Sequence, residues 1–231
     1  MNLHNLHRRL GLAFCFFVLL ASGSGIIHNV MSWTQPPPPR PLPSGKIDSA
    51  RITVPPAAAL AALGADAPPA TLLAVREIGG TPHYQAFFQG DPVPRYVSAE
   101  TGRPDPAADE RFACEIALRH LCGQSVRRTD YLTAFNREYI EIYRILPVYR
   151  FDADDGKGTR VYVSTMTGTV TRHTDDRRQL DANIFGLFHK FNFIRNKNFR
   201  NTLLTLTTAG IFLTAGAGVL LYFRRPGRSR M

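Results

Sequence analysis

The sequence predicts an α+β protein with two tandem units, each a helix packed on antiparallel strands, flanked by two transmembrane α-helices. Three observations lead to this prediction: an uncharged apolar run near each end of the chain, a proline-rich stretch after the first run, and a sequence pattern that occurs twice in between. The 44% share of hydrophobic residues is typical of a folded chain rather than a disordered one.

Residues 1–9 form a short basic segment, and residues 10–33 are predicted to form the first transmembrane helix. The apolar run from Leu10 to Ile27 has about the length that crosses the hydrocarbon of a bilayer. A cleaved signal peptide has the same plan, with a basic start, an apolar core and small residues. We favour a retained anchor because the apolar character resumes at Ile26, and Trp33 follows where an interfacial aromatic residue would lie.

Residues 201–223 are predicted to form the second transmembrane helix, between Arg200 and a basic tail at 224–231. Small residues recur on one face of each helix, where a neighbouring backbone can approach closely. The predicted helix-packing residues are Ser22 and Gly25, with Asn29 on the same face, and Gly210, Thr214 and Gly218. We therefore expect the two helices to pack along this seam.

The formal net charge of +10 does not predict a nucleic-acid-binding protein. The excess of Lys and Arg lies at the two chain ends and between Lys190 and Arg200, so it borders the apolar runs and leaves the middle of the chain close to neutral. Arginine clusters at both ends predict cytoplasmic termini and an exported middle. The sequence therefore predicts a two-pass membrane protein, with the lipid bilayer as its first partner.

Residues 34–45 contain the run QPPPPRPLPS, which cannot propagate a helix and favours the polyproline II conformation. Directly after a membrane helix, this run predicts a stiff linker that lifts the next domain off the bilayer. A ligand for an SH3-type domain is the alternative interpretation.

Residues 46–104 and 105–181 are predicted to be two copies of one unit, because the element YVSxxTG ends at Gly102 in the first and at Gly168 in the second. An Ala- and Leu-rich segment and further strand-like runs precede each element. We predict helices at 56–63 and 109–121, and strands at 71–78, 83–88, 139–146 and 148–151 besides the two YVS strands. The Thr-Gly pair is typical of a tight turn, in which glycine tolerates a positive φ.

This organisation resembles the PepSY family. The YVSxxTG element, the helix-plus-strands unit and the flanking helices carry the resemblance, and the segments LHRRLGL at 6–12 and FGLFHKF at 185–191 resemble parts of PepSY-associated transmembrane proteins. The resemblance implies a protein of the bacterial inner membrane with a periplasmic PepSY lobe. Such lobes resemble the inhibitory propeptides of secreted peptidases, which implies an exported binding partner.

Residues 182–200 are predicted to form an amphipathic interfacial segment. Its apolar residues recur at helical spacing at Ile184, Leu187, Phe188, Phe191 and Ile194. Packing of this segment on the lobe is the alternative.

Local signatures of a catalytic nucleophile or a nucleotide-binding loop are missing from the sequence. The run DADDG at 152–156 resembles the start of a calcium loop, but Val163 stands where the last acidic ligand belongs, so we predict an acidic turn. Cys114 and Cys122 are too far apart along a predicted helix to form a disulfide. The sequence therefore predicts no catalytic residue and no metal site.

His28, His189 and His7 are the candidate cofactor-binding residues, as ligands of haem b. His7 and His28 lie near opposite ends of the first helix, and a turn of 100° per residue places them within about 60° of the same side. Some PepSY-family membrane proteins are reductases whose transmembrane histidines hold haem, so the resemblance implies His28 and His189 as an outer axial pair. Those reductases have more membrane helices than two, so we expect no cofactor.

Two functions from different classes follow. The preferred one is an accessory protein, anchored in the inner membrane, whose periplasmic lobe binds or regulates a partner through a strand edge. The alternative is a haem-binding electron-transfer subunit of a reductase, linked to iron acquisition. A periplasmic protein, another membrane protein and a second copy of the chain are the partners that this layout allows, whereas nucleic acid is not.

Overall fold

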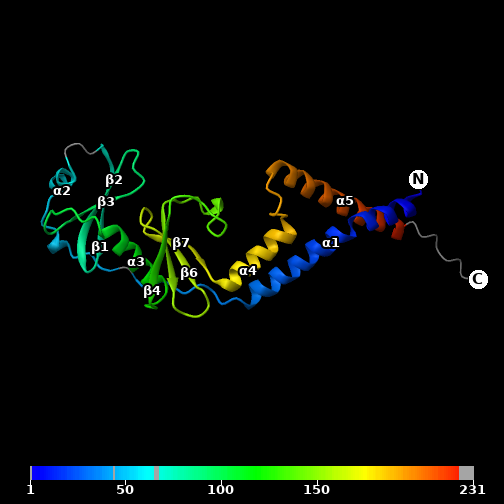
Figure 1. Ribbon diagram of the computed structural model, residues 1–231, viewed down its shortest axis with the longest axis horizontal. Coiled ribbons are helices and arrows are strands. Elements are labelled where there is room, and N and C mark those ends of the chain that lie inside the picture. Colours follow the sequence, from blue (N-terminus) through cyan, green and yellow to red (C-terminus); the bar gives the residue numbers. More distant parts are fainter. Residues whose placement is uncertain (1, 44, 65–67, 224–231) are drawn as a thin grey trace, which may run out of the picture. The chain divides into compact units, whose positions relative to one another are not determined.

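The computed structural model describes residues 2–43, 45–64 and 68–223. The chain divides into two compact units, one formed by Met1–Pro36 with Arg177–Met231 and the other by Pro37–Asp176. We call the first the helical unit and the second the lobe. Figure 1 shows the long helices in the helical unit and all strands in the lobe. The described residues thus confirm an α+β chain with a long apolar helix near each end.

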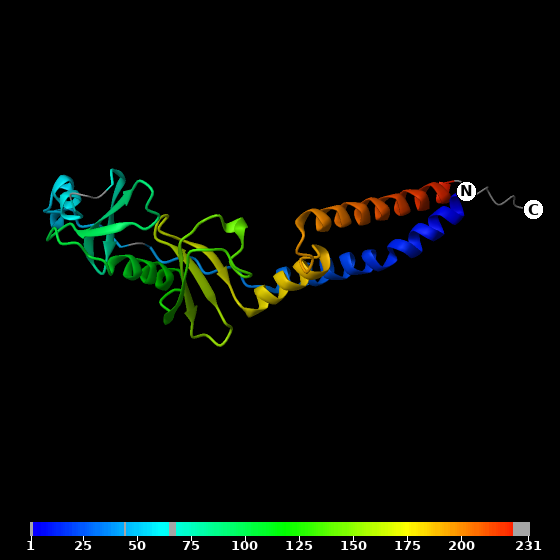
Figure 2. The same cartoon turned by 45° about the horizontal axis from the view of Figure 1, so that its top comes forward.

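The helical unit contains α1 (Leu3–Thr34) and α5 (Lys197–Phe223), which lie side by side in opposite directions (Figure 2). Both helices are long and apolar enough to cross a membrane. They begin before the predicted apolar runs because asparagines cap them. The Asn2 side chain accepts a hydrogen bond from the His4 amide at 3.2 Å, and the Asn196 side chain accepts one from the Phe199 amide at 3.0 Å.

A third helical segment of this unit runs along α1. It consists of α4 (Asp176–Ile184) and a π-helical turn (Phe185–His189), and the buried Phe191 that follows contacts the Phe17 ring at 6.0 Å. The predicted interfacial segment at 182–200 thus includes the end of α4, the π-helical turn and the start of α5, and the lobe as a compact unit ends at Asp176. Because α4 begins with polar residues, a search for apolar runs does not predict that it packs on α1.

The first half of the lobe contains a 3₁₀ turn (Ser49–Arg51), α2 (Pro56–Ala62) and a three-stranded antiparallel sheet, which we call sheet A. Its strands, in spatial order, are β1 (Ala70–Ile78), β2 (Thr81–Phe88) and β3 (Arg95–Ser98). These elements agree with the predicted ones. The register places Val75 opposite Tyr84 and Tyr84 opposite Val97, so these apolar side chains form one face, on which Ala59 of α2 packs.

The second half contains α3 (Ala108–His120) and a four-stranded antiparallel sheet, which we call sheet B. Its strands, in spatial order, are β4 (Val126–Leu132), β5 (Val148–Ala153), β6 (Arg160–Ser164) and β7 (Thr169–Thr174). The strand predicted at 139–146 was wrong, because these residues form a loop with a 3₁₀ turn (Glu141–Tyr143). The Tyr139 ring stacks on the Tyr162 ring of β6, with the ring centres 4.8 Å apart. Tyr139 therefore covers the sheet instead of forming a strand in it.

The two halves share α3, which packs on both sheets. Its Phe112 belongs to one buried cluster with Ile78 and Tyr96 of sheet A and Val161 and Val163 of sheet B. The two halves therefore share a buried cluster around α3, beside separate clusters at α2 and at Tyr139. The repeated turn is confirmed in both copies.

The amide of Gly102 donates to the Ser98 carbonyl at 2.9 Å, and that of Gly168 donates to the Ser164 carbonyl at the same distance. Both glycines have a positive φ, 70° and 68°. This matched geometry explains why both copies carry a glycine at this position.

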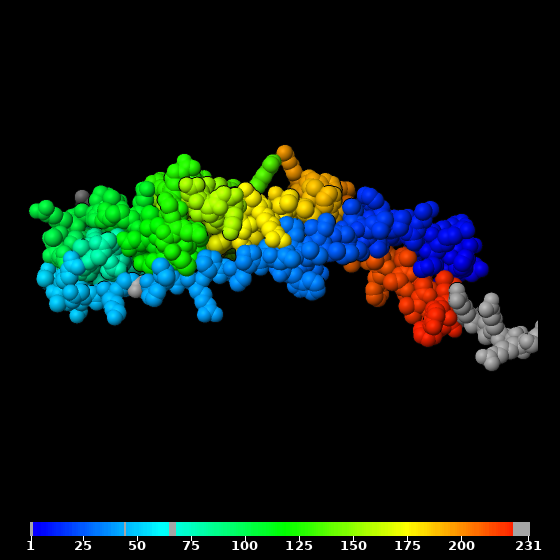
Figure 3. Space-filling view, turned by 90° about the horizontal axis from the view of Figure 1, so that it is seen from below, coloured from blue at the N-terminus to red at the C-terminus, as the bar shows by residue number. Residues whose placement is uncertain are grey.

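Much of the proline-rich segment belongs to the lobe. The Leu42 amide donates to the Arg119 carbonyl at 2.9 Å, and the Cys122 thiol lies 3.5 Å from the Arg40 carbonyl oxygen. Figure 3 shows this part of the chain, in light blue, along the lobe surface. The predicted tail at 224–231 lies outside the described residues.

Candidate functional site in the helical unit

The less exposed side of α1 forms a stripe with a spacing of three and four residues. It includes Leu3, His7, Leu10, Phe14, Phe17, Ala21, Ser24, His28 and Met31. This spacing is that of a helix packed against neighbours running nearly along its axis. His7 and His28 therefore lie on the same side of α1, as the helical periodicity predicted.

The small face of α5 packs against the N-terminal half of this stripe. Gly210 lies so close to α1 that an added Cβ would overlap the Phe14 ring, and a Cβ at Gly218 would lie 3.1 Å from the His7 imidazole. The His7 Nδ1 atom lies 3.0 Å from the Thr214 carbonyl oxygen. Gly210, Thr214 and Gly218 thus line the face of α5 that meets α1.

The predicted partners on α1 were wrong. Ser22 and Asn29 are exposed, and among the described residues nothing would lie within 4 Å of a Cβ at Gly25. Ser24 is buried instead, and its hydroxyl donates to the Ala21 carbonyl at 3.1 Å. The reason is that α4 and the π-helical turn occupy this part of α1, so α5 pairs with the half nearer the N-terminus.

A polar cluster joins α1 to this third segment. The His28 Nδ1 atom lies 3.1 and 3.0 Å from the two carboxylate oxygens of Asp181, whose residue is only 7% exposed. The Ser24 hydroxyl lies 3.5 Å from His189 Nδ1. A carboxylate buried this far must be hydrogen-bonded, so His28 stabilises Asp181 and fixes α4 to α1.

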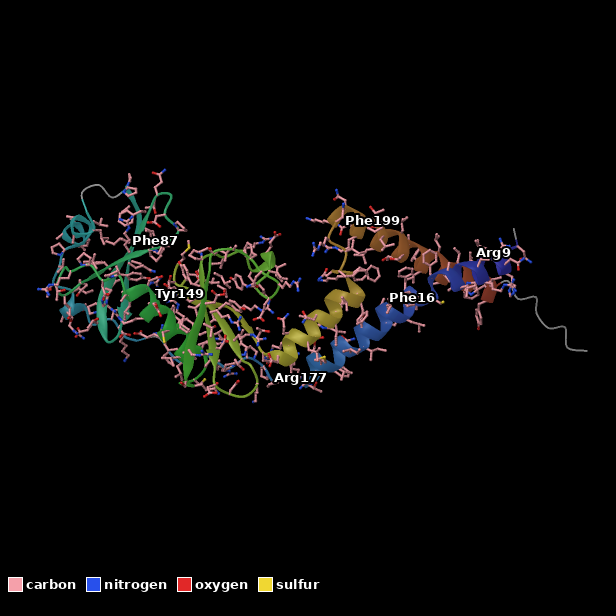
Figure 4. The ribbon with its side chains drawn as sticks, in the orientation of Figure 1. Arg9, Phe16, Phe87, Tyr149, Arg177 and Phe199 are labelled. Carbon is pink, nitrogen blue, oxygen red and sulfur yellow. The ribbon has the colours of Figure 1, made fainter. Side chains whose placement is uncertain are left out.

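Aromatic and backbone contacts extend the cluster. The Phe185 ring contacts the His28 imidazole at 4.8 Å and the His189 imidazole at 4.4 Å. Arg177, labelled in Figure 4, lies near the start of α4 and donates to the Thr34 hydroxyl. The next residue, Arg178, donates to the Pro36 carbonyl at 2.6 Å. These contacts hold the two chain segments together where both leave the helical unit. Sequence reasoning missed Asp181, because a single acidic residue in a polar stretch carries no signal.

The side chains of one chain do not fit a haem held by His28 and His189. The Phe185 ring contacts both imidazoles, where a porphyrin would need a free slot. His7 lies about 31 Å away along α1, at 1.5 Å per residue. Neither His28 nor His189 lines either of the two cavities described below.

The larger cavity, about 380 Å³, lies between the N-terminal part of α1 and the C-terminal part of α5. It is lined by His4, His7, Gly218, Leu221 and Tyr222. The second, about 250 Å³ and almost wholly apolar, we call the aromatic cavity. It is lined by Phe16, Phe17, Leu20, Leu187, Phe188, Phe191, Phe193 and Leu203.

The lobe buries a polar cluster of its own, centred on Asp109 of α3. This carboxylate accepts hydrogen bonds from the hydroxyls of Tyr96 at 2.7 Å and Tyr149 at 2.8 Å. The Gln85 amide donates to the Tyr96 hydroxyl and to the Thr165 carbonyl, both at 2.8 Å. Burial and the nearby carboxylate raise the pKa of both tyrosines well above the ordinary range. The cluster links the two sheets through α3, which is a structural role.

Other histidines of the lobe form pairs that the sequence did not indicate. Nε2 of the buried His83 lies 3.3 Å from the Asp105 carboxylate, and Arg111, which also bonds Asp105, holds the pKa of that carboxyl below its usual range. Nε2 of His120 lies 3.0 Å from Nδ1 of His173, and burial lowers the pKa of His120. Among the described residues, groups of three or more metal-ligating side chains do not occur.

Two smaller predictions can be compared with the structure. All three cysteines are unpaired. The acidic run at 152–156 leads into the β5–β6 turn, where the Asp155 carboxylate accepts from the Lys157 amide at 2.9 Å and from the Thr159 hydroxyl at 2.5 Å. These are the local hydrogen bonds of a turn.

Comparisons of the chain with protein-family models, curated proteins and solved structures found no match. The resemblance to the PepSY family therefore stays a prediction from the sequence.

Proposed function

We propose that this chain is a two-pass inner-membrane protein that presents its lobe in the periplasm as a binding or regulatory module. The observation that carries the proposal is the packing of α1 on α5. These two span-length helices come from opposite ends of the chain and enclose the whole lobe sequence between them. A domain inserted in this way has both its ends attached to one membrane side.

Fixing both ends of a domain suits a module that acts next to the membrane. The His28–Asp181 contact and the arginines of α4 support this, because they tie the outgoing and returning chain segments together. With both segments held, the lobe is tethered to the membrane at both its ends, which raises its effective concentration toward a membrane-bound partner.

The outer edge of β1 is the docking edge that we propose for this partner. Among the described residues β1 pairs on one side only, with β2, and from Leu72 to Ile78 it does so residue for residue. Leu72 is 56% exposed. A regular, partly apolar edge suits the addition of a strand from a partner.

The edge strand β4 of sheet B provides a contrast. Its register shifts between Arg128 and Asp130, and the charged residues around this irregularity are exposed. Irregular pairing and exposed charges are the features by which proteins prevent edge-to-edge association. β4 therefore serves as an internal control for β1.

Reporter fusions test the membrane topology. Alkaline phosphatase fused within the lobe is expected to be active, and a fluorescent protein that folds only in the cytoplasm is expected to be active at the N-terminus. A cytoplasmic signal from a fusion between residues 50 and 176 would overturn the proposal.

Site-specific photocrosslinking tests the docking edge. A photoreactive amino acid at Leu72 of β1 is expected to give a discrete adduct in the cells that make the protein, whereas one at Thr129 of β4 is not. Equal labelling from both positions, or none from Leu72, would reject β1 as the docking edge while leaving the topology result unaffected.

A further inference from the structure

The stretch that leads into α5 is basic and has no acidic residue to balance it. Residues 182–223 contain neither Asp nor Glu, but they contain Lys190, Arg195, Lys197 and Arg200. In the topology proposed above, this stretch enters the membrane from the exported side, where Lys and Arg are not expected to accumulate. Their presence there calls for a local physical reason.

Two of these four side chains have contacts within the helical unit. Lys190 Nζ lies 5.4 Å from the centre of the Phe185 ring, and Arg200 donates to the Asn192 side chain at 3.4 Å. Arg195 and Lys197 are exposed, and neither forms an ion pair with any described residue. They are therefore the cations available to an external anion.

The aromatic cavity lies beside this basic stretch, and the proposed membrane insertion places it at the depth of hydrocarbon. Leu203, in its wall, follows Arg200 by three residues, about 4.5 Å along α5. Leu20, on the opposite wall, precedes the end of the apolar run at Ile27 by about 10 Å along α1. The basic residues thus lie at headgroup level while the cavity lies at the level of the upper acyl chains.

We propose that the aromatic cavity and the adjoining Arg195 and Lys197 form a binding site for one anionic phospholipid. The cavity takes part of an acyl chain, and the two cations bind the phosphate and its anionic headgroup. The two halves fit one amphiphile because Arg195 follows Phe193 of the cavity wall by two residues, and Lys197 begins α5 about 9 Å before Leu203. The inference rests on the proposed membrane insertion, and it adds a ligand to the anchor.

Native mass spectrometry of the full-length protein, released from mild detergent after titration with dioleoyl phosphatidylglycerol or dioleoyl phosphatidylcholine, tests the site. Because the acyl chains are identical, a difference reports the headgroup. We expect retention of one phosphatidylglycerol in preference to phosphatidylcholine. In the double variant Arg195→Gln/Lys197→Gln the preference for phosphatidylglycerol should fall roughly fivefold or more. This estimate follows from the interaction energy of about 1 kcal/mol between one basic side chain and an anionic lipid surface.

Matched variants distinguish binding at this site from the effects of overall charge and overall hydrophobicity. Arg103→Gln/Arg137→Gln, which neutralises two exposed arginines of the lobe, should leave the preference unchanged. Leu20→Trp fills the aromatic cavity and should reduce retention of both lipids, whereas Leu19→Trp, at a neighbouring residue that is 71% exposed, should not.

Four results would overturn the inference. The first three are equal retention of the two lipids, a loss of preference as large in the lobe variant as in the double variant, and retention that Leu20→Trp does not change. A dimer that excludes lipid would also overturn it, because a second copy would then fill the cavity. These measurements need no membrane orientation, so a failed topology experiment and a failed lipid site remain distinguishable.

Discussion

The lobe and the helical unit each bury a carboxylate, but they stabilise it differently. Asp109 is 6% exposed and accepts from two tyrosine hydroxyls that connect both sheets of the lobe. Asp181 is 7% exposed and is paired with one imidazole, that of His28, which is itself partly exposed. The first carboxylate lies inside a network of neutral donors, whereas the second makes a single contact between two helical segments.

This difference reflects how the two units are held together. The lobe has a shared apolar core around Phe112, and its buried polar network adds connections between elements that already pack. The helical unit has almost no enclosed core, so its association depends on close approach at Gly210 and on the polar contacts of α1 with α4. The lobe should therefore unfold cooperatively, while the helical unit should lose its contacts locally.

The largest effect is expected from Asp109→Ala. It leaves the hydroxyls of Tyr96 and Tyr149 without their acceptor, so the free energy of unfolding of the lobe should fall by about 3 kcal/mol. Denaturant titration of the full-length protein, followed by near-ultraviolet circular dichroism, measures this change. Asp154→Ala, at an exposed position of the lobe, is the control. Equal midpoints for the two variants would contradict the structural role of Asp109.

In the helical unit, Gly210→Leu should have the largest effect. The new side chain must displace Phe14, and overpacking of this kind costs about 2 kcal/mol. Disulfide trapping between cysteines introduced at Gly11 and Thr214, in a background without native cysteines, should become inefficient. Gly216→Leu, where an added Cβ meets nothing within 4 Å, should trap as well as the parent. Efficient trapping in Gly210→Leu would show that the helices do not meet at this glycine.

High pH should destabilise the lobe through its buried tyrosines. Because the pKa values of Tyr96 and Tyr149 are raised on folding, the unfolded chain loses its tyrosine protons first, near the ordinary value of about 10. Stability should be fully present below that pH and decline as the pH rises above it. Thermal melts from pH 9 to 11 should show this decline reduced in Tyr149→Phe and unchanged in Tyr222→Phe, which lies outside the lobe. A decline that is identical in both variants would remove this cause.

The contact between His28 and Asp181 should behave as one interaction. His28→Gln, Asp181→Asn and the double variant should each lower the hydrogen-exchange protection of α4 by a similar amount, so that the coupling energy is about 1 kcal/mol. Because each single change already breaks the pair, the second change should add little. Additive losses would mean that the two side chains do not act on each other.

The smallest effects are expected at Ser22 and Ser24, and they distinguish the packing face of α1 that the sequence predicts from the face that the structure shows. Ser24→Ala removes a buried hydroxyl and should lower the protection of the α1–α4 contact by about 1 kcal/mol, whereas Ser22→Ala should change it by less than about 0.5 kcal/mol. The same exchange measurement reports both variants. A larger effect at Ser22 would restore the predicted packing face.

The site was only partly predictable, and the reason is visible in particular residues. Helical periodicity placed His7 and His28 on one side of α1, and small residues marked the face of α5 that meets it. Periodicity gives a face of one helix, however, and does not say which neighbour covers it at each level. That is why Ser22 and Gly25 were assigned to α5, and why Asp181, which lies far along the chain from His28, was missed.

Sequence by itself determined the elements whose signal is local. Apolar runs of span length gave α1 and α5, and the repeated YVSxxTG gave β3, β6 and their glycine turns, because hydrophobicity and positive φ are properties of short segments. Only the tertiary structure decided that α3 serves both sheets, that Tyr139 covers a sheet instead of forming a strand, and that α4 lies on α1. Each of these depends on what a side chain meets from a distant part of the chain, where burial and hydrogen bonding outweigh local preference.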